Sequence, residues 1–206
     1  MTRGPAREMM QDTRSSFSAG HRLLRAWWGL VWLLLFRPSP RPLHRWRAFL
    51  LRVHGADVHP TAHVYPRARV WFPPNLTLER HACIADDVDV YSVAPIRIGA
   101  YSVVSQYSFL CGATHDFEDT DHPLVPAPIS IGRRCWIAAD VFVAPGVTIG
   151  NGAVVGARSS VFGDLPGWSV AVGNPAKVSR PRGIGPADFG DAEDADADAL
   201  SEDPVA

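Results

Sequence analysis

The chain has 206 residues and a formal net charge of -1, which allows one domain with an adequate core and argues against a nucleic-acid-binding protein. The charge is nevertheless polarised along the chain. Seven arginines and no acid lie between Arg22 and Arg52, whereas residues 183–206 contain eight acids and no base. We expect the acidic tail 183–206 and the N-terminal residues 1–21 to be disordered.

Residues 22–56 are predicted to form a hydrophobic and basic helical hairpin. The apolar run 26–36 is shorter than the ~20 residues of a membrane-spanning helix, and it leads into prolines and arginines, not into a signal-peptide cleavage site. After it, four apolar residues recur on one face of a basic amphipathic helix, with the arginines largely off that face: Leu43, Trp46, Leu50 and Val53.

Two interpretations of this hairpin stay open. It caps the open end of a solenoid, which every solenoid requires, or it attaches to anionic lipid. The protein is expected in the cytoplasm, and in the second case peripherally at the cytoplasmic face of the membrane.

Branched aliphatic residues recur with a period of six through residues 57–182. A helix would repeat every three or four residues and a flat strand every two, so the period is typical of a parallel β-helix built from hexapeptides. One large aliphatic residue points into a narrow core, and a small residue follows at the corner. Five groups of three predict about five coils: Val58, Val64 and Val70; Leu78, Ile84 and Val90; Ile98, Val104 and Leu110; Ile131, Ile137 and Val143; Ile149, Val155 and Val161.

Breaks in the period come only between these groups, so every insertion is expected at one corner of the prism. The longest insertion follows Leu110 and contains His115 and Asp116. A neutral imidazole there can take a proton from a hydroxyl group and later return it, although the ring could equally serve only to fix a turn. His81 and His122 raise the alternative of a zinc site, for which their spacing is poor.

The three cysteines are expected to be reduced thiols packed in or near the solenoid. Their number is odd, and no C-x-x-C pair is present. This usage is typical of a cytosolic protein and gives little support to a metal site. The residues are Cys83, Cys111 and Cys135.

Six motifs together resemble those of the colanic acid biosynthesis acetyltransferases. They are R-P-L-H-R-W-R-A-F-L-L-R-V-H-G-A, V-Y-P-R-A-R-V-W-F-P-P-N-L-T-L, D-D-V-D-V-Y-S-V, A-T-H-D-F, W-I-A-A-D-V-F-V-A-P-G-V-T-I-G and V-G-N-P-A-K-V. These enzymes are left-handed β-helix acyltransferases with hexapeptide repeats, close to maltose and galactoside acetyltransferases. The resemblance covers roughly residues 22–182. It implies an all-β solenoid that acts as an acetyl-CoA-dependent O-acetyltransferase on a sugar hydroxyl in exopolysaccharide or cell-surface glycan biosynthesis.

The same resemblance implies a homotrimer without a metal, with active sites between neighbouring prisms. His115 matches the general base, and the backbone N–H of Ala139 matches the donor that stabilises the oxyanion. Relatives usually carry Thr-Lys where this chain has Phe162 and Gly163, so one expected contact to CoA is missing. The remaining contacts to CoA are expected at Trp136, Ala139, Ala157, Lys177 and Arg180.

Asp89 and Tyr91 are candidates for binding the acceptor, a sugar or a lipid-linked glycan. A carboxylate and an aromatic ring suit the hydroxyl groups and the apolar ring face of a sugar. Asp87 and Asp89 could instead alternate with valines simply because they face solvent. Two other functions remain open, a non-catalytic hexapeptide scaffold and a zinc enzyme similar to γ-class carbonic anhydrase.

Overall fold

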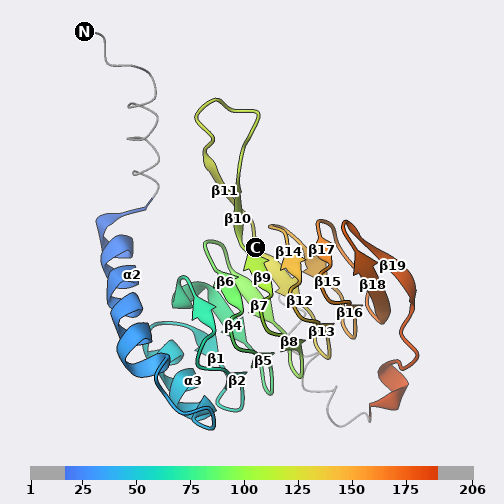
Figure 1. The fold of residues 1–206 in the computed structure, drawn as a ribbon, viewed down its shortest axis with the longest axis horizontal. Helices are drawn as coiled ribbons and strands as arrows, with labels where there is room; N and C mark the ends of the chain where they lie inside the picture. The colour runs from blue at the N-terminus through green and yellow to red at the C-terminus, as the bar shows by residue number, and fades with distance from the viewer. Residues whose placement is uncertain (1–16, 190–206) are drawn as a thin grey trace, which may run out of the picture.

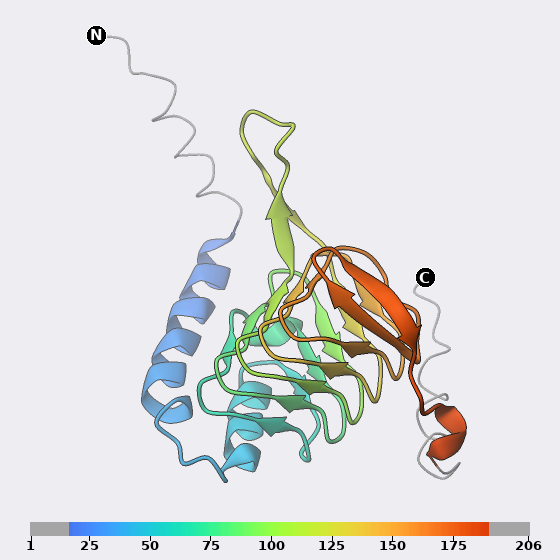
Figure 2. The same ribbon diagram turned by 45° about the vertical axis from the view of Figure 1, so that its right-hand side comes forward.

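The structure is a computed structural model that describes residues 17–189, a triangular solenoid with a helical hairpin at its N-terminal end (Figure 1, Figure 2). The predictions for residues 1–16 and 190–206 lie outside the described residues. Two short segments differ from the expected disorder. The first helix begins at Ala19, because Ser18 Oγ accepts a hydrogen bond from His21 N and caps it. Near the other end, Phe189 packs against Trp168 after a 3₁₀ turn, η3 (Pro186–Asp188).

Short parallel strands form the three faces of the prism, and each strand pairs with its counterpart in the next coil. The first face contains β1 (Asp57–Val58), β4 (Leu76–Leu78), β7 (Ile96–Ile98), β12 (Ile129–Ile131) and β15 (Thr148–Ile149). The second contains β2 (His63–Val64), β5 (Cys83–Ile84), β8 (Val103–Val104), β13 (Trp136–Ile137), β16 (Val154–Val155), β18 (Ser169–Gly173) and the antiparallel β19 (Ala176–Pro181). The third contains β3 (Arg69–Val70), β6 (Asp89–Tyr91), β9 (Phe109–Cys111), β14 (Phe142–Val143) and β17 (Ser160–Val161).

The register confirms the five predicted groups of aliphatic residues. Val58, Leu78, Ile98, Ile131 and Ile149 stack directly above one another on the first face, and all five are buried. Each buried aliphatic side chain therefore packs on its counterparts in the neighbouring coils, which gives one continuous hydrophobic core.

A partial sixth coil extends the solenoid beyond the predicted five. Leu165 bridges to Ile149, and Ala171 pairs with Val155. The period of six missed this coil because Ala171 is too small to mark a core position by its side chain. The antiparallel strand β19 then pairs with β18 along the second face.

The N-terminal hairpin consists of α2 (Ala19–Val31), a π-helical turn η1 (Trp32–Phe36) and α3 (His44–Val53), and it caps the first coil. The edge strands β1, β2 and β3 have carbonyl groups with no preceding coil to bond to. Side chains of the hairpin donate to these oxygens: Arg52 Nη1 to Val58 O (3.4 Å), Arg47 Nε to Val64 O (2.6 Å), Trp32 Nε1 to Ala68 O (2.8 Å) and Trp28 Nε1 to Val70 O (2.7 Å).

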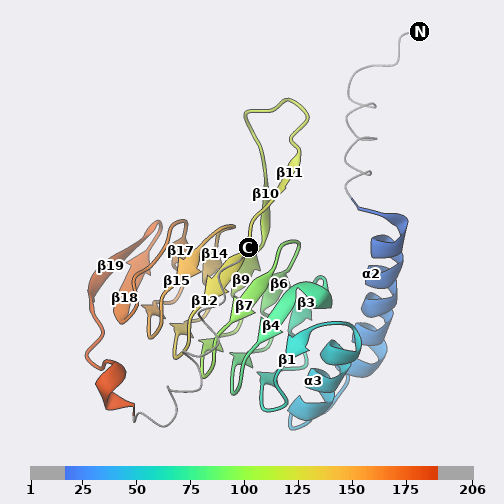
Figure 3. The same cartoon turned by 180° about the vertical axis from the view of Figure 1, so that it is seen from behind.

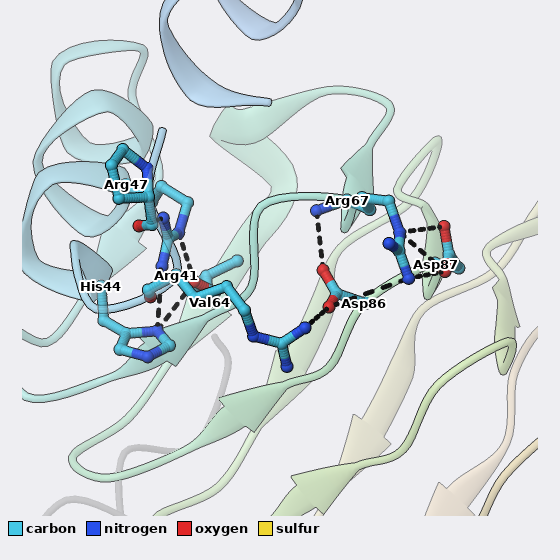
Figure 4. A network of polar contacts seen from close by, with 8 residues as sticks. Arg41, His44, Arg47, Val64, Arg67, Asp86 and Asp87 are labelled. Carbon is cyan, nitrogen blue, oxygen red and sulfur yellow. Dashed lines mark hydrogen bonds and ion pairs between the residues drawn. The ribbon is translucent and has the colours of Figure 1, made fainter. Parts of the chain in front are cut away.

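The orientation of α3 differs from the predicted one. Arg47 faces the coil and is fully buried, whereas Leu43, Trp46 and Val53 are exposed. The reason is that a cap needs donors for the edge carbonyls as well as apolar contact. The guanidinium of Arg47 (Figure 4) also donates to Ser39 Oγ and to the carbonyl oxygens of residues 40 and 41. Burial lowers the pKa of Arg47. Leu50 packs inward as predicted.

The three cysteines are free thiols in the structure, as predicted. Cys83 and Cys111 are half-buried, and Cys135 is buried, which raises the pKa of its thiol to about 11. Within residues 17–189, none of the helices has the length and apolar character needed to cross a bilayer.

Candidate active site

The long insertion forms a β-hairpin that projects from the corner between the third and first faces, here called the hairpin corner (Figure 1, Figure 3). Its strands are β10 (Ala113–His115) and β11 (Leu124–Pro126), which pair antiparallel. Gly112 allows the chain to leave the coil at this point. Its N–H donates to Tyr91 O (3.0 Å), and a Cβ atom at Gly112 would lie 2.6 Å from that oxygen.

His115 lies at the end of β10 with its ring exposed and its orientation fixed. Its Nδ1 atom is 2.6 Å from the carbonyl oxygen of His122. A carbonyl can only accept, so Nδ1 carries the proton, and in the neutral ring Nε2 keeps a lone pair that faces away from this bond. The arrangement suits a base that takes a proton at Nε2.

The other histidines do not join His115 through their rings. His81 stacks on Tyr101 with ring centroids 5.0 Å apart, and His122 Nδ1 lies 3.2 Å from Asp116 O. Residues 17–189 contain no group of three or more His, Cys, Asp or Glu side chains that could hold a metal ion. His122 instead contributes its backbone oxygen to orient the ring of His115.

Ala139 lies at a different corner, between the second and third faces, here called the Ala139 corner. It follows β13, and it stacks directly below Ala157 of the next coil, since Arg158 N donates to Ala139 O (2.9 Å). Asp140 has a φ of 60°, so Ala139 occupies the second position of a tight turn. Within residues 17–189, nothing accepts a hydrogen bond from the Ala139 N–H.

A cavity of about 360 Å³ opens at the Ala139 corner, in the coils that precede Ala139. Trp136 marks its upper side: its Nε1 atom donates to Ser105 Oγ (3.1 Å), and half of its surface is exposed. The cavity is lined by Arg41, Tyr65, Arg67, Cys83, Ala85, Asp86, Val103, Ser105, Gln106 and Tyr107.

Asp86, the acid that lines this cavity, and its neighbour Asp87 are already engaged with arginines (Figure 4). Asp86 is buried and accepts from Arg41 Nη1 (2.9 Å) and from the backbone N–H of Arg67 (3.0 Å). Asp87 binds the guanidinium of Arg67 through both oxygens. The polar atoms that remain for a ligand are therefore hydroxyl, amide and guanidinium groups, which can bind the hydroxyl groups of a sugar.

Asp89 and Tyr91 lie on the third face, away from this cavity. Asp89 lines a second cavity of about 260 Å³ beneath α2, together with three tryptophans and two arginines: Arg25, Trp28, Trp32, Arg69 and Trp71. Burial raises the pKa of Asp89, and the charge of Arg69 opposes the shift. Tyr91 packs edge-on against Trp71, with centroids 5.4 Å apart.

The residues expected to meet CoA lie along the second face and its corner. Lys177 and Arg180 are exposed on β19, opposite Val172 and Val170 of β18. Phe162 follows β17 and is mostly exposed, with its ring 5.7 Å from that of Phe142. Phe162 therefore stands where the resemblance to the acetyltransferases implies a polar contact to CoA.

The structure brings Trp136, Ala139 and Ala157 together but leaves His115 at another corner of the same chain. The third face separates the two corners, because Ala139 precedes β14 whereas the hairpin follows β9 on that face. Sequence reasoning missed the corner cavity. One pattern in the sequence could have indicated it. A turn follows each core aliphatic residue of the second face by two residues, and Gln106 and Ala139 occupy equivalent positions in two of these turns.

Comparison with known proteins identifies the class that this fold and site define. Residues 128–163 match the family model for bacterial transferase hexapeptide repeats. The chain is 48% identical over 166 residues to the putative colanic acid biosynthesis acetyltransferase WcaF of Escherichia coli K12, covering 81% of this chain and 91% of the relative.

Two solved structures have the same fold. A hexapeptide-repeat acetyltransferase from Vibrio cholerae, in complex with acetyl-CoA, is 28% identical with a TM-score of 0.71 and covers 80% of this chain and 90% of its own. A maltose O-acetyltransferase from Clostridium difficile 630 is 26% identical with a TM-score of 0.70 and covers 82% and 92%.

The protein is thus a hexapeptide-repeat acyltransferase with a left-handed β-helix, as predicted. More specifically, it belongs to the family of colanic acid biosynthesis acetyltransferases that includes WcaF. The predicted enzyme class is therefore confirmed, and a non-catalytic scaffold is disfavoured.

Proposed function

We propose that the protein transfers the acetyl group of acetyl-CoA to a sugar hydroxyl during the biosynthesis of an exopolysaccharide or another cell-surface glycan. The WcaF relative and the sugar-acetylating neighbour support the acceptor class, and the acetyl-CoA complex supports the donor. The observation that carries the chemistry is the bond from His115 Nδ1 to His122 O, since it leaves Nε2 ready to accept a proton.

In this mechanism His115 acts as the general base. Nε2 takes the proton of the sugar hydroxyl while its oxygen forms a bond to the thioester carbonyl carbon. The free N–H of Ala139 donates to the resulting oxyanion. When the carbon–sulfur bond breaks, His115 returns the proton to the departing thiolate, so the ring ends in its starting state. No covalent intermediate on the protein is needed, and positioning contributes much of the rate.

The active site is completed between two copies of the chain in a homotrimer. His115 and Ala139 occupy different corners of one prism. The β-hairpin projects away from the solenoid (Figure 2), and His115 is the last residue of its first strand. A hairpin that reaches the Ala139 corner of a neighbouring copy brings the base to the oxyanion donor. Cyclic symmetry then gives three equivalent sites.

The donor and the acceptor approach this site from opposite directions along the Ala139 corner. The acetyl-CoA arm follows Ala139 and Ala157 toward Lys177 and Arg180, and the acceptor occupies the corner cavity below Trp136. Asp89 and Tyr91 form the alternative acceptor site, under α2. Three free thiols and the use of acetyl-CoA support a cytoplasmic location.

Mixing two inactive variants tests whether the site lies between copies. His115→Ala chains retain the Ala139 corner, and Ala139→Pro chains, which lack the N–H, retain the hairpin. In randomly mixed trimers about one quarter of the hairpin–corner pairs are intact, so we expect about one quarter of the wild-type turnover. Release of CoA thiol with a panel of sugars, glycosides and nucleotide sugars is the readout. Mixed trimers no more active than the separate variants would show that the site does not lie between copies.

A further inference from the structure

The N-terminal helical hairpin, which caps the first coil, has a second apolar face on the side that faces away from that coil. Leu23, Trp27, Leu30 and Leu34 follow the helical spacing i, i+4, i+7 and i+11, and 73%, 55%, 47% and 58% of their surfaces are exposed. Four further apolar residues are exposed at the N-cap of α3 and along it: Leu43, Trp46, Phe49 and Val53. These eight residues are called the outer face below.

The two helical segments that carry the outer face are joined through Trp46. The indole of Trp46 stacks on Phe49, and its Nε1 atom donates to Leu35 O (3.1 Å), which ties α3 to the end of η1. Capping does not use these side chains, because the first coil is covered by Trp28, Phe36 and the inward residues of α3. Eight exposed large apolar residues on one helical hairpin mark an interaction surface.

The charge around the outer face is of one sign. Residues 13–56 contain no acid, and four exposed arginines flank the apolar residues: Arg22, Arg37, Arg45 and Arg52. An apolar face with tryptophans, bordered by arginines, matches an anionic bilayer surface, where indole and guanidinium groups lie at the level of the headgroups. A second copy of the same face would place arginines against arginines.

The position of the helical hairpin places the outer face at one end of the solenoid. It covers the N-terminal end of the solenoid, opposite β18 and β19 (Figure 1). If the prisms of the proposed trimer are parallel, all three outer faces lie at the same end and contact one plane together. This step rests on the proposed function. Three linked contacts bind a surface far more tightly than one.

We propose that the outer face docks the enzyme on an anionic membrane and that the acceptor is a lipid-linked glycan. The corner cavity supports the second part, because Arg41 of the hairpin and Tyr65 of the first coil line it. The cavity thus begins at the end of the solenoid that faces the bilayer. A glycan anchored in that bilayer enters the cavity from the membrane side at the first coil and reaches Ala139 three coils further on.

Vesicle sedimentation tests the docking with the full chain. The wild type should bind vesicles of phosphatidylglycerol and phosphatidylcholine, bind pure phosphatidylcholine much less, and lose binding as salt rises. Trp27→Glu/Leu30→Glu should weaken binding roughly tenfold or more, because it removes buried apolar area and adds negative charge. The matched control Val178→Glu/Ile184→Glu adds the same charges at exposed apolar positions near the opposite end of the solenoid and should bind like the wild type.

The outcomes separate the membrane proposal from the proposed function. Trp27→Glu/Leu30→Glu should keep its turnover with a soluble sugar acceptor and lose most of it with a glycan lipid in vesicles. Equal vesicle binding by this variant and the wild type would overturn the docking. It would also be overturned if the wild type formed an assembly larger than a trimer and the variant did not, because the outer face would then contact other copies of the chain. Vesicle binding without transfer to any sugar would overturn the proposed function and leave the docking in place.

Discussion

Replacing Ala139 by proline tests the oxyanion donor with little disturbance of the fold. The substitution deletes one N–H that donates to no group within residues 17–189. Proline already occupies the equivalent position of the first coil. Val64 and Ile137 stack on the second face, and the residues two positions after them are Pro66 and Ala139. The second position of such a turn also favours proline.

The expected loss is therefore in catalysis and not in stability. Removing one oxyanion donor costs about 2.7–4 kcal/mol of transition-state stabilisation, so kcat should fall by about 10²–10³. The free energy of unfolding should change by about 1 kcal/mol or less, because no native hydrogen bond is lost and the backbone conformation suits proline.

Steady-state kinetics with acetyl-CoA and thermal unfolding measure the two quantities. Ala139→Ser, which keeps the N–H, is the matched control and should retain kcat. If Ala139→Pro folds normally and keeps kcat within a few-fold of wild type, the N–H of Ala139 is not the oxyanion donor.

Four further predictions concern residues at other places in the fold. His115→Ala should lower kcat by about 10²–10⁴ and shift Tm by only a few degrees, since the ring is exposed on a projecting hairpin, and substantial remaining turnover would contradict its role as base. Arg47→Met should lower the free energy of unfolding in urea by about 2–4 kcal/mol, because Val64 O and the other carbonyl acceptors lose their donor, and unchanged stability would show that the bonds contribute nothing. Cys135 should resist alkylation in the folded protein. Because burial raises its pKa from 9.0 to about 11, the free energy of unfolding should fall as pH rises between these values. Measured against pH, this free energy should decline for the wild type and stay constant for Cys135→Ser. Asp89→Asn should raise Tm at neutral pH, because burial raises the pKa of Asp89 and so destabilises the folded protein when the carboxyl group is charged. An unchanged KM for the acceptor would exclude Asp89 from the acceptor site.

The solenoid could be predicted in detail because its core repeats. Each buried aliphatic residue marks one strand, and the breaks in the period mark the insertion corner, so the groups that begin at Val58 and Ile131 stack as expected. The orientation of α3 could not be predicted from its hydrophobic pattern. Arg47 is turned inward by the unpaired carbonyl groups of the edge strands, which belong to other parts of the chain.

The candidate site could be predicted in its residues but not in its arrangement. A motif shows that His115 and Ala139 are present, yet only the topology shows that the third face separates them. The corner cavity was missed for a similar reason. Its lining residues, among them Arg41, Tyr65 and Tyr107, come from the hairpin and from successive coils, and no short motif contains them together.

The cap has a consequence for how the chain folds during synthesis. The hairpin precedes the coil that it covers, so the first coil finds donors for its free carbonyl groups as soon as it leaves the ribosome. Each finished coil then offers its edge to the next, and most neighbouring coils are only 18 or 20 residues apart, as from Val58 to Leu78 and from Ile131 to Ile149. Contacts over such short separations form quickly. We therefore expect vectorial growth from the cap, in which no open edge waits for a partner from the far end of the chain.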